Sequence, residues 1–170
     1  MTSLEGTWQR LGITSAHLAA CRLPPYAEAT ELVAAGTDTF GRPQRMTAGT
    51  LAAWQAMVAA AHGDSVELLL VSAYRSVRYQ CEVIERKLEA GRSIDDILRV
   101  NAPPGHSEHH TGRALDLTTP GVEPLTEAFE GTEAFAWLDA RADRFGFSMS
   151  YPRNNADGID YEPWHWARKG

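Results

Sequence analysis

The hydrophobic residues between positions 47 and 63 recur every three or four places, which is the spacing of one buried face of an α-helix. Thr47 is suited to cap the beginning of this helix, and Gly63 is suited to end it. The stretch that follows, VELLLVSAY (66–74), is a continuous apolar run of strand length. Such a run predicts a buried central strand.

The next part of the chain predicts two further helices. Ser76 precedes a helical pattern that stops at Gly91, and SIDD (93–96) has the spacing of a capping box at the start of a shorter helix. NAPPG (101–105) ends that pattern, because proline lacks the backbone donor that a helix needs and glycine is a poor helix former.

Strands dominate the pattern of the C-terminal part. RALDLTT (113–119), FSMSYP (147–152) and IDYEPWHW (159–166) each predict a strand. Between the first two, Thr132 can cap a helix that ends at Gly146. Because strands and helices mix without a regular alternation, we expect an α+β domain with a small, mainly antiparallel sheet and helices packed on it.

Length and composition favour a single domain that spans residues 1–170. A hydrophobic content of 44% and a charged content of 22% are typical of a soluble globular protein. The net charge of −6 and the isoelectric point near 5.5 argue against electrostatic binding of nucleic acid or anionic lipid. No stretch approaches the roughly 20 apolar residues that a membrane span needs.

The N-terminal sequence has no basic segment followed by an apolar one, so no secretory signal peptide is predicted. This favours the cytoplasm, although a periplasmic or extracellular protein whose signal had been removed would have the same sequence. Cys21 and Cys81 lie far apart and lack a zinc-binding spacing. We therefore expect them to be free thiols.

The segment GHSEHHTGRALDL (105–117) holds three of the six histidines. His106 and His110 are four residues apart, as are the two ligands of the helical zinc motif HExxH. The glutamate stands at the wrong position for that motif, and the neighbouring prolines and glycines disfavour a helix. A helical zinc site is therefore rejected.

A loop that leads into a strand is the alternative for the same segment. His109 then projects from the loop, and Asp116 lies on the strand among alanine and leucine residues. An isolated carboxylate is costly to bury without a partner. A metal ion is one such partner and an arginine is another, so a metal site and a solvated loop with a structural aspartate both stay open.

The C-terminal segment YEPWHW favours the metal site. His109, Asp116 and His165 make a three-ligand set that leaves a fourth zinc position for water, and Glu162 would be a base beside that water. Glu162 and His165 are three residues apart, so on a regular strand they face opposite sides. Their convergence requires a bulge or an irregular edge near Pro163.

Three motifs, in this order, resemble those of the zinc D-alanyl-D-alanine metallopeptidases. SAYRSVRYQ (72–80) resembles their Y-R-S…Q segment, SEHHTGRALD (107–116) matches S-x-H-x-x-G-x-A-x-D, and EPWH (162–165) matches E-x-x-H. The likeness is greatest to D,D-carboxypeptidases of the VanY type in the LAS group. It runs from about residue 66 to residue 166, and residues 1–45 lie outside the motifs. The resemblance implies the LAS/hedgehog-type zinc peptidase fold.

The resemblance also implies one Zn²⁺ per chain, held by His109, Asp116 and His165. Glu162 corresponds to the catalytic base of the family. Arg75 corresponds to the arginine that contacts the carbonyl or the carboxylate of the substrate.

We also make predictions for four further residues that lie in the motifs or next to them. Ser107 and Gln80 match positions that contact substrate in the family. His106 and His110 match no ligand. We expect His106 to be an exposed loop residue, and His110 is left as a candidate cleft residue.

The implied function is hydrolysis of the terminal D-Ala-D-Ala bond of peptidoglycan stem peptides by a zinc D,D-carboxypeptidase. Alternatives that share the motifs are a D-Ala-D-Ala dipeptidase, an L,D-carboxypeptidase and an endolysin-type peptidoglycan endopeptidase. A non-catalytic, zinc-containing peptidoglycan-binding module is the alternative from another class. Glu162, Arg75 and the open fourth zinc position favour catalysis over binding alone. A structural zinc site needs neither a neighbouring acid nor an open position.

Overall fold

The computed structural model describes residues 3–170 and has a small antiparallel sheet at its centre. The sheet has four strands in the order β3–β4–β6–β5, and each neighbouring pair is antiparallel. The strands are β3 (Leu69–Ser72), β4 (Ala114–Thr118), β5 (Phe147–Met149) and β6 (His165–Arg168). The sheet and its helices confirm the expected α+β class.

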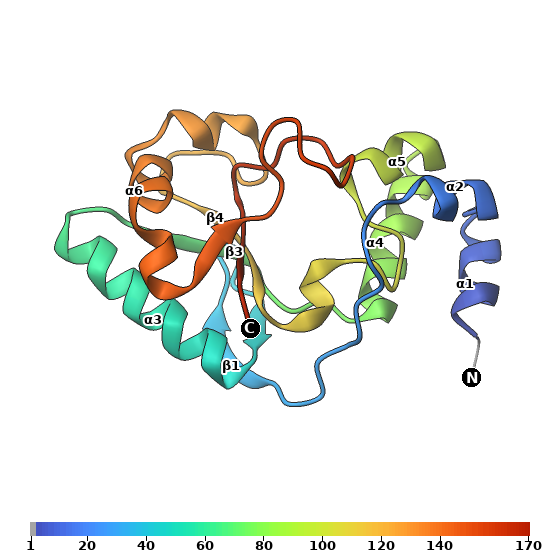
Figure 1. Ribbon diagram of the computed structural model, residues 1–170. Helices are drawn as coiled ribbons and strands as arrows, with labels where there is room; N and C mark the ends of the chain where they lie inside the picture. Colours follow the sequence, from blue (N-terminus) through green and yellow to red (C-terminus); the bar gives the residue numbers. More distant parts are fainter. Residues whose placement is uncertain (1–2) are drawn as a thin grey trace.

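The helices lie on two sides of this sheet (Figure 1). One group is α3 (Ala48–Gly63) and α6 (Glu133–Arg141). The other group is α1 (Leu4–Arg10), α2 (Ser15–Ala20), α4 (Val77–Glu89) and α5 (Ile94–Val100). Three short 3-10 helices complete the helical structure of the described residues: η1 (Glu108–Thr111), η2 (Glu127–Gly131) and η3 (Ala142–Phe145).

The predicted helix caps are confirmed. The side chains of Thr47, Ser76, Ser93 and Thr132 each accept a hydrogen bond from the backbone N–H three residues further on. Each cap satisfies a donor that the first helical turn leaves without a partner. The starts of α3, α4, α5 and α6 are therefore determined by local sequence.

The helix that was predicted to run from Thr132 to Gly146 has two parts. It is α-helical up to Arg141 and continues as the 3-10 helix η3. Gly146 ends it with φ of 82°, a left-handed conformation that glycine adopts without steric cost. The prediction that the helix ends at Gly146 is confirmed, and the prediction of one continuous α-helix is wrong.

All four predicted strands are shorter than expected, and the difference is small only for β4. The strand predicted for residues 159–166 begins only at His165, and the strand predicted for 147–152 ends at Met149. Pro163 lies in a turn just before β6, where its lack of a backbone N–H removes no ladder hydrogen bond.

The sequence pattern gave no expectation for the first 46 residues. In the structure, residues 3–32 contain α1 and α2, and an antiparallel pair of strands follows. These strands are β1 (Val33–Thr37) and β2 (Pro43–Met46).

The described residues form two hydrophobic clusters. The larger lies between the sheet, α3 and α6, and includes Trp54, Leu115, Leu117, Leu138 and Phe147. The smaller joins the other four helices through Leu11, Ile13, Cys81, Ile84 and Ile97. The connection from α5 to β4, which carries the histidine motif, runs from the smaller cluster to the larger one.

The two cysteines are free thiols, as expected. Cys21 is half-buried and Cys81 is buried in the smaller cluster. Within residues 3–170, no helix has both the length and the apolar character that crossing a membrane requires.

Candidate metal centre

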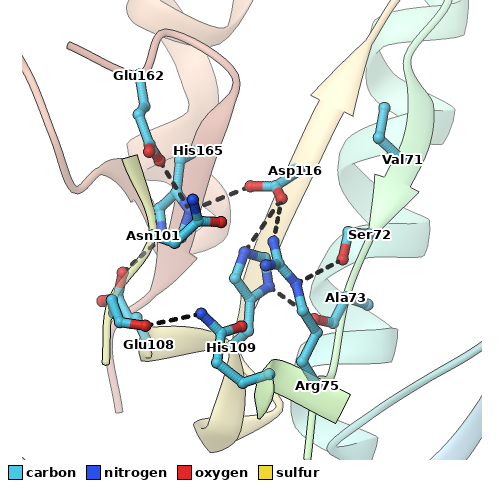
Figure 2. A network of polar contacts seen from close by, with 12 residues as sticks. Val71, Ser72, Ala73, Arg75, Asn101, Glu108, His109, Asp116, Glu162 and His165 are labelled. Carbon is cyan, nitrogen blue, oxygen red and sulfur yellow. Dashed lines mark hydrogen bonds and ion pairs between the residues drawn. The ribbon is translucent and has the colours of Figure 1, made fainter. Parts of the chain in front are cut away.

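The three predicted metal ligands meet in the interior of the protein. The exposed fraction is 3% for His109, 2% for Asp116 and 3% for His165. Their candidate ligand atoms all lie within 4.8 Å of one another. Figure 2 shows Asp116 between His165 on one side and His109 with Arg75 on the other.

The register of the sheet accounts for this convergence. Asp116 of β4 pairs with His165 of β6 and with Ser72 of β3. Side chains directly opposite one another on antiparallel strands lie on the same face of the sheet. His109 reaches that face from η1, and its Nδ1 donates a hydrogen bond of 2.7 Å to the carbonyl of Ala73.

The Nε2 atom of His109 shows that these residues fit a metal ion. Because Nδ1 carries the proton given to Ala73, Nε2 is the acceptor of the neutral ring. Nε2 lies 3.1 Å from Asp116 Oδ2, yet it is buried without a partner in hydrogen-bond geometry. Burial, together with the charge of Arg75, lowers the pKa of His109 to about 4. Two imidazoles and a carboxylate are a donor set that zinc prefers.

Asp116 accepts a hydrogen bond from Arg75 and also lies next to His109 and His165. Arg75 Nη2 donates to Asp116 Oδ2 at 2.7 Å, and Asp116 Oδ1 lies 3.1 Å from His165 Nδ1. Burial opposes ionisation of Asp116, but His109, His165 and Arg75 together hold its pKa well below the usual value. We considered a metal ion and an arginine as alternative partners for the buried Asp116. In the structure Asp116 binds Arg75 and also faces the two histidines, so the arginine does not exclude a metal ion.

Glu108 holds the ring of His165, a contact that the sequence did not predict. Glu108 Oε2 lies 2.8 Å from His165 Nε2 and accepts a hydrogen bond of 2.6 Å from Ser150 Oγ. Burial lowers the pKa of His165, but its contacts with Asp116 and Glu108 outweigh burial and raise it to about 10. The only sequence signal for Glu108 was its place within the SEHH motif.

Glu162 lies beside His165, with 3.7 Å between its Oε2 and His165 Nδ1. The two residues converge because a turn at Pro163 precedes β6, which is the irregular edge, rather than the bulge, of the two arrangements that we expected. His165 N donates to the Glu162 carbonyl at 3.2 Å, and Glu162 N donates to the Tyr151 carbonyl at 3.0 Å. Burial raises the pKa of Glu162 to about 7, which suits a group that takes up and releases a proton near neutral pH.

A cleft opens onto these groups. The three predicted substrate contacts, Arg75, Gln80 and Ser107, line it together with His109 and His165. Gln80 donates from Nε2 to the Ala102 carbonyl at 2.8 Å. Its Oε1 is buried without a hydrogen-bond partner in the described part of the chain, and a ligand N–H would satisfy it.

The cleft also has lining residues that the sequence did not indicate. The ring of Tyr151 lies 4.7 Å from that of His165, and Tyr151 is buried. Leu23 reaches the cleft from the N-terminal part of the chain. Neither residue belongs to a motif, and a lone leucine or tyrosine is most often part of a core.

His106 and His110 hold the loop rather than line the cleft. His106 is half-buried instead of exposed, because its Nδ1 donates to the Leu23 carbonyl at 3.0 Å. His110 is fully buried; its Nδ1 donates to the Arg75 carbonyl at 2.6 Å, and its Nε2 accepts from Gly105 N–H at 3.1 Å. His110 therefore ties the motif loop to the segment that carries Arg75.

Residues 43–170 match the family model of VanY, D-alanyl-D-alanine carboxypeptidase. The D-alanyl-D-alanine carboxypeptidase of Enterococcus faecalis is 31% identical to this chain over 121 residues. That alignment covers 65% of this chain and 43% of the enzyme, so the chain spans less than half of the relative's length.

Solved structures agree with the family match. The LdcB LD-carboxypeptidase superposes with a TM-score of 0.74 at 32% identity, over 86% of this chain and 72% of that one. A Zn(II) complex of VanY gives a TM-score of 0.66 at 26% identity, over 87% and 83% of the two chains. VanYB with D-alanine-D-alanine gives 0.67 at 27% identity, over 87% and 82%. Because the family model matches residues 43–170, which is most of this chain, the chain belongs to the VanY family of D-alanyl-D-alanine carboxypeptidases.

Proposed function

We propose that this chain is a zinc-dependent D,D-carboxypeptidase that removes the terminal D-alanine from peptidoglycan stem peptides ending in D-Ala-D-Ala. One observation carries the proposal. The buried side chains of His109, Asp116 and His165 bring their ligand atoms within 4.8 Å, and Glu162 lies beside them in the same cleft. Support comes from VanY structures that contain Zn(II) or D-alanine-D-alanine.

His109 Nε2, His165 Nδ1 and the Asp116 carboxylate would hold the zinc ion. When bound, zinc polarises the scissile carbonyl and makes water acidic enough to lose a proton near neutral pH. The ligand rings are already oriented by their other nitrogens, since His109 donates to the Ala73 carbonyl and His165 contacts Glu108. Such outer contacts fix the tautomer and the direction of a histidine ligand.

Glu162 takes the proton that the attacking water loses and passes it to the nitrogen of the leaving D-alanine. Its carboxyl lines the cleft and lies 3.7 Å from His165 Nδ1, so it is next to the place where that water would react. A structural zinc site has no use for a neighbouring acid of this kind. This distinguishes an enzyme from a binding module.

Arg75 is suited to receive the C-terminal carboxylate of the peptide. Its guanidinium is fixed by two contacts, from Nε to Ser72 Oγ at 3.1 Å and from Nη2 to Asp116 Oδ2 at 2.7 Å. A fixed planar guanidinium binds a carboxylate with little further loss of entropy. Ser107 and Gln80 line the same cleft and supply polar groups for the peptide backbone.

The test is incubation of the zinc-loaded protein with a pentapeptide stem, followed by mass analysis of the products. We expect loss of one alanine, and no loss with Glu162→Ala. Retention of all five residues by the wild type, with one zinc bound per chain, would refute the D,D-carboxypeptidase activity.

The similarity to LdcB favours a second candidate, an L,D-carboxypeptidase. A tetrapeptide stem and the dipeptide D-Ala-D-Ala, run in parallel, separate the activities. Trimming of the tetrapeptide alone would assign the L,D-activity, and cleavage of the dipeptide alone would assign a dipeptidase.

A further inference from the structure

Residues 3–32 lie outside the part of the chain that the family model covers, yet they hold the loop of the histidine motif. Tyr26 N–H donates to the Gly105 carbonyl at 2.8 Å, and Ala29 N–H donates to the His110 carbonyl at 2.8 Å. The N-terminal segment thus runs along the motif loop and satisfies its backbone acceptors.

The N-terminal segment comes close to the loop of the histidine motif at two glycines of that loop, Gly105 and Gly112. A Cβ atom at Gly105 would lie 2.8 Å from Leu4 Cδ2, and a Cβ atom at Gly112 would lie 2.8 Å from Leu32 Cδ2. Both distances are shorter than van der Waals contact between carbon atoms. A side chain at either glycine would therefore require the leucine beside it to shift.

The beginning of the segment is anchored independently of the loop backbone. Helices α1 and α2 share the smaller hydrophobic cluster with α4 and α5, beside which they lie in Figure 1. The indole Nε1 of Trp8 donates to the Pro104 carbonyl at 2.9 Å. A segment fixed at both ends in this way holds the residues between them in place.

Leu23 lies between these anchors and reaches the catalytic cleft. It is 5% exposed, and its carbonyl accepts the hydrogen bond from His106. The aliphatic residues that line the cleft include Leu23, Val100 and Ile159. Of these, Val100 is 39% exposed and Ile159 is half-buried, so Leu23 is the most buried of the three.

We propose that Leu23 determines how large a C-terminal residue the cleft accepts. The inference rests on the proposed function, in which Arg75 receives the C-terminal carboxylate and the scissile carbonyl lies at the metal ligands. The proposal places the side chain of the terminal residue against the aliphatic part of the lining, which includes Leu23. A methyl group suits that space, and a larger side chain meets the fixed leucine.

The test compares pentapeptide stems that end in D-Ala with stems that end in D-Val, using zinc-loaded wild type and Leu23→Ala. The variant should raise kcat/KM for the D-Val stem, relative to the D-Ala stem, by about tenfold or more, since one or two methylene groups discriminate by at least that much. Leu18→Ala is the matched control, because Leu18 lies on the same segment and packs in the smaller cluster instead of the cleft. Its ratio should equal that of the wild type.

Leu23→Val provides a milder variant in case Leu23→Ala loses zinc or unfolds, and it should shift the ratio in the same direction. An unchanged ratio in a folded, zinc-loaded variant would overturn the inference while leaving the proposed function intact. So would a change seen only when the penultimate residue of the stem is altered. If the wild type releases no amino acid from either stem, the proposed function fails and the inference falls with it.

Discussion

Glu108 Oε2 lies 2.8 Å from His165 Nε2, although the two residues are separated by 57 positions in the sequence. The contact engages one nitrogen of the ring, so the other, Nδ1, faces Asp116 and Glu162. Ser150 Oγ fixes the same carboxylate oxygen from a third segment. Glu108 is therefore a positioning residue for the metal centre.

Replacing Glu108 with glutamine keeps the shape of the side chain and removes its charge. We expect the affinity for zinc to fall by roughly 10- to 100-fold, as is usual when the outer partner of a histidine ligand is changed. Competition with a zinc-chelating dye would measure the affinity of each variant for zinc. Glu123→Gln, at an exposed glutamate, is the control and should leave the affinity unchanged. Equal zinc affinity in Glu108→Gln and wild type would contradict the positioning role.

Zinc should stabilise the fold through the same residues. A ligand that binds only the folded state adds about 2.7 kcal/mol to the free energy of unfolding at 100 times its Kd. Urea unfolding with and without zinc at that concentration should show this difference for the wild type. His109→Ala removes the Nε2 donor, so its free energy of unfolding should not respond to the same zinc concentration. A full response in the variant would exclude His109 as a ligand.

Asp38, a buried carboxylate outside the group of candidate metal ligands, should make stability depend on pH. Its buried carboxylate accepts hydrogen bonds from the backbone N–H groups of Phe40 and Arg42, and from the side chains of Arg42 and Gln44. Burial opposes ionisation, but these donors hold the pKa of Asp38 below its usual value. Since the folded pKa is below the unfolded one, near about 4, the stabilisation is complete above that pH. It is lost as the pH falls through the folded pKa.

Asp38→Asn should therefore lower the free energy of unfolding by about 2 kcal/mol at pH 7, the usual contribution of hydrogen bonds to a charged group. The difference from the wild type should shrink when the pH is lowered below about 4. Urea unfolding at neutral and acid pH measures both values. An equal difference at the two pH values would show that the charge of Asp38 contributes nothing.

Gly112 tests the packing of the N-terminal segment on the motif loop. Its φ is +66°, and an added Cβ would lie 2.8 Å from Leu32 Cδ2. Gly112→Ala should lower the free energy of unfolding by about 2 kcal/mol, because left-handed backbone alone costs about 1–2 kcal/mol outside glycine. In the double variant with Leu32→Ala, the two effects should not add, since the second change removes the atom in the way. Strict additivity would mean that the two residues do not touch.

Much of this protein could be predicted from local sequence. The caps Thr47, Ser76, Ser93 and Thr132 lie where expected, because a cap and its N–H partner are only three residues apart. The buried strand β3 was also foreseen, since a short apolar run between turn-forming residues leaves few alternatives. The three candidate ligands and Glu162 were named from the motifs and the family resemblance, and the structure brings these residues together.

Contacts between distant segments were decided only by the tertiary structure. The convergence of Glu162 with His165 depends on a turn where the pattern predicted a strand, and the hold of Glu108 on His165 depends on the place of η1 beside β6. Leu23 reaches the cleft because helices α1 and α2 pack on α4 and α5. Periodicity and capping report on neighbours within a few residues, whereas these contacts follow from strand register and from which apolar faces pack together.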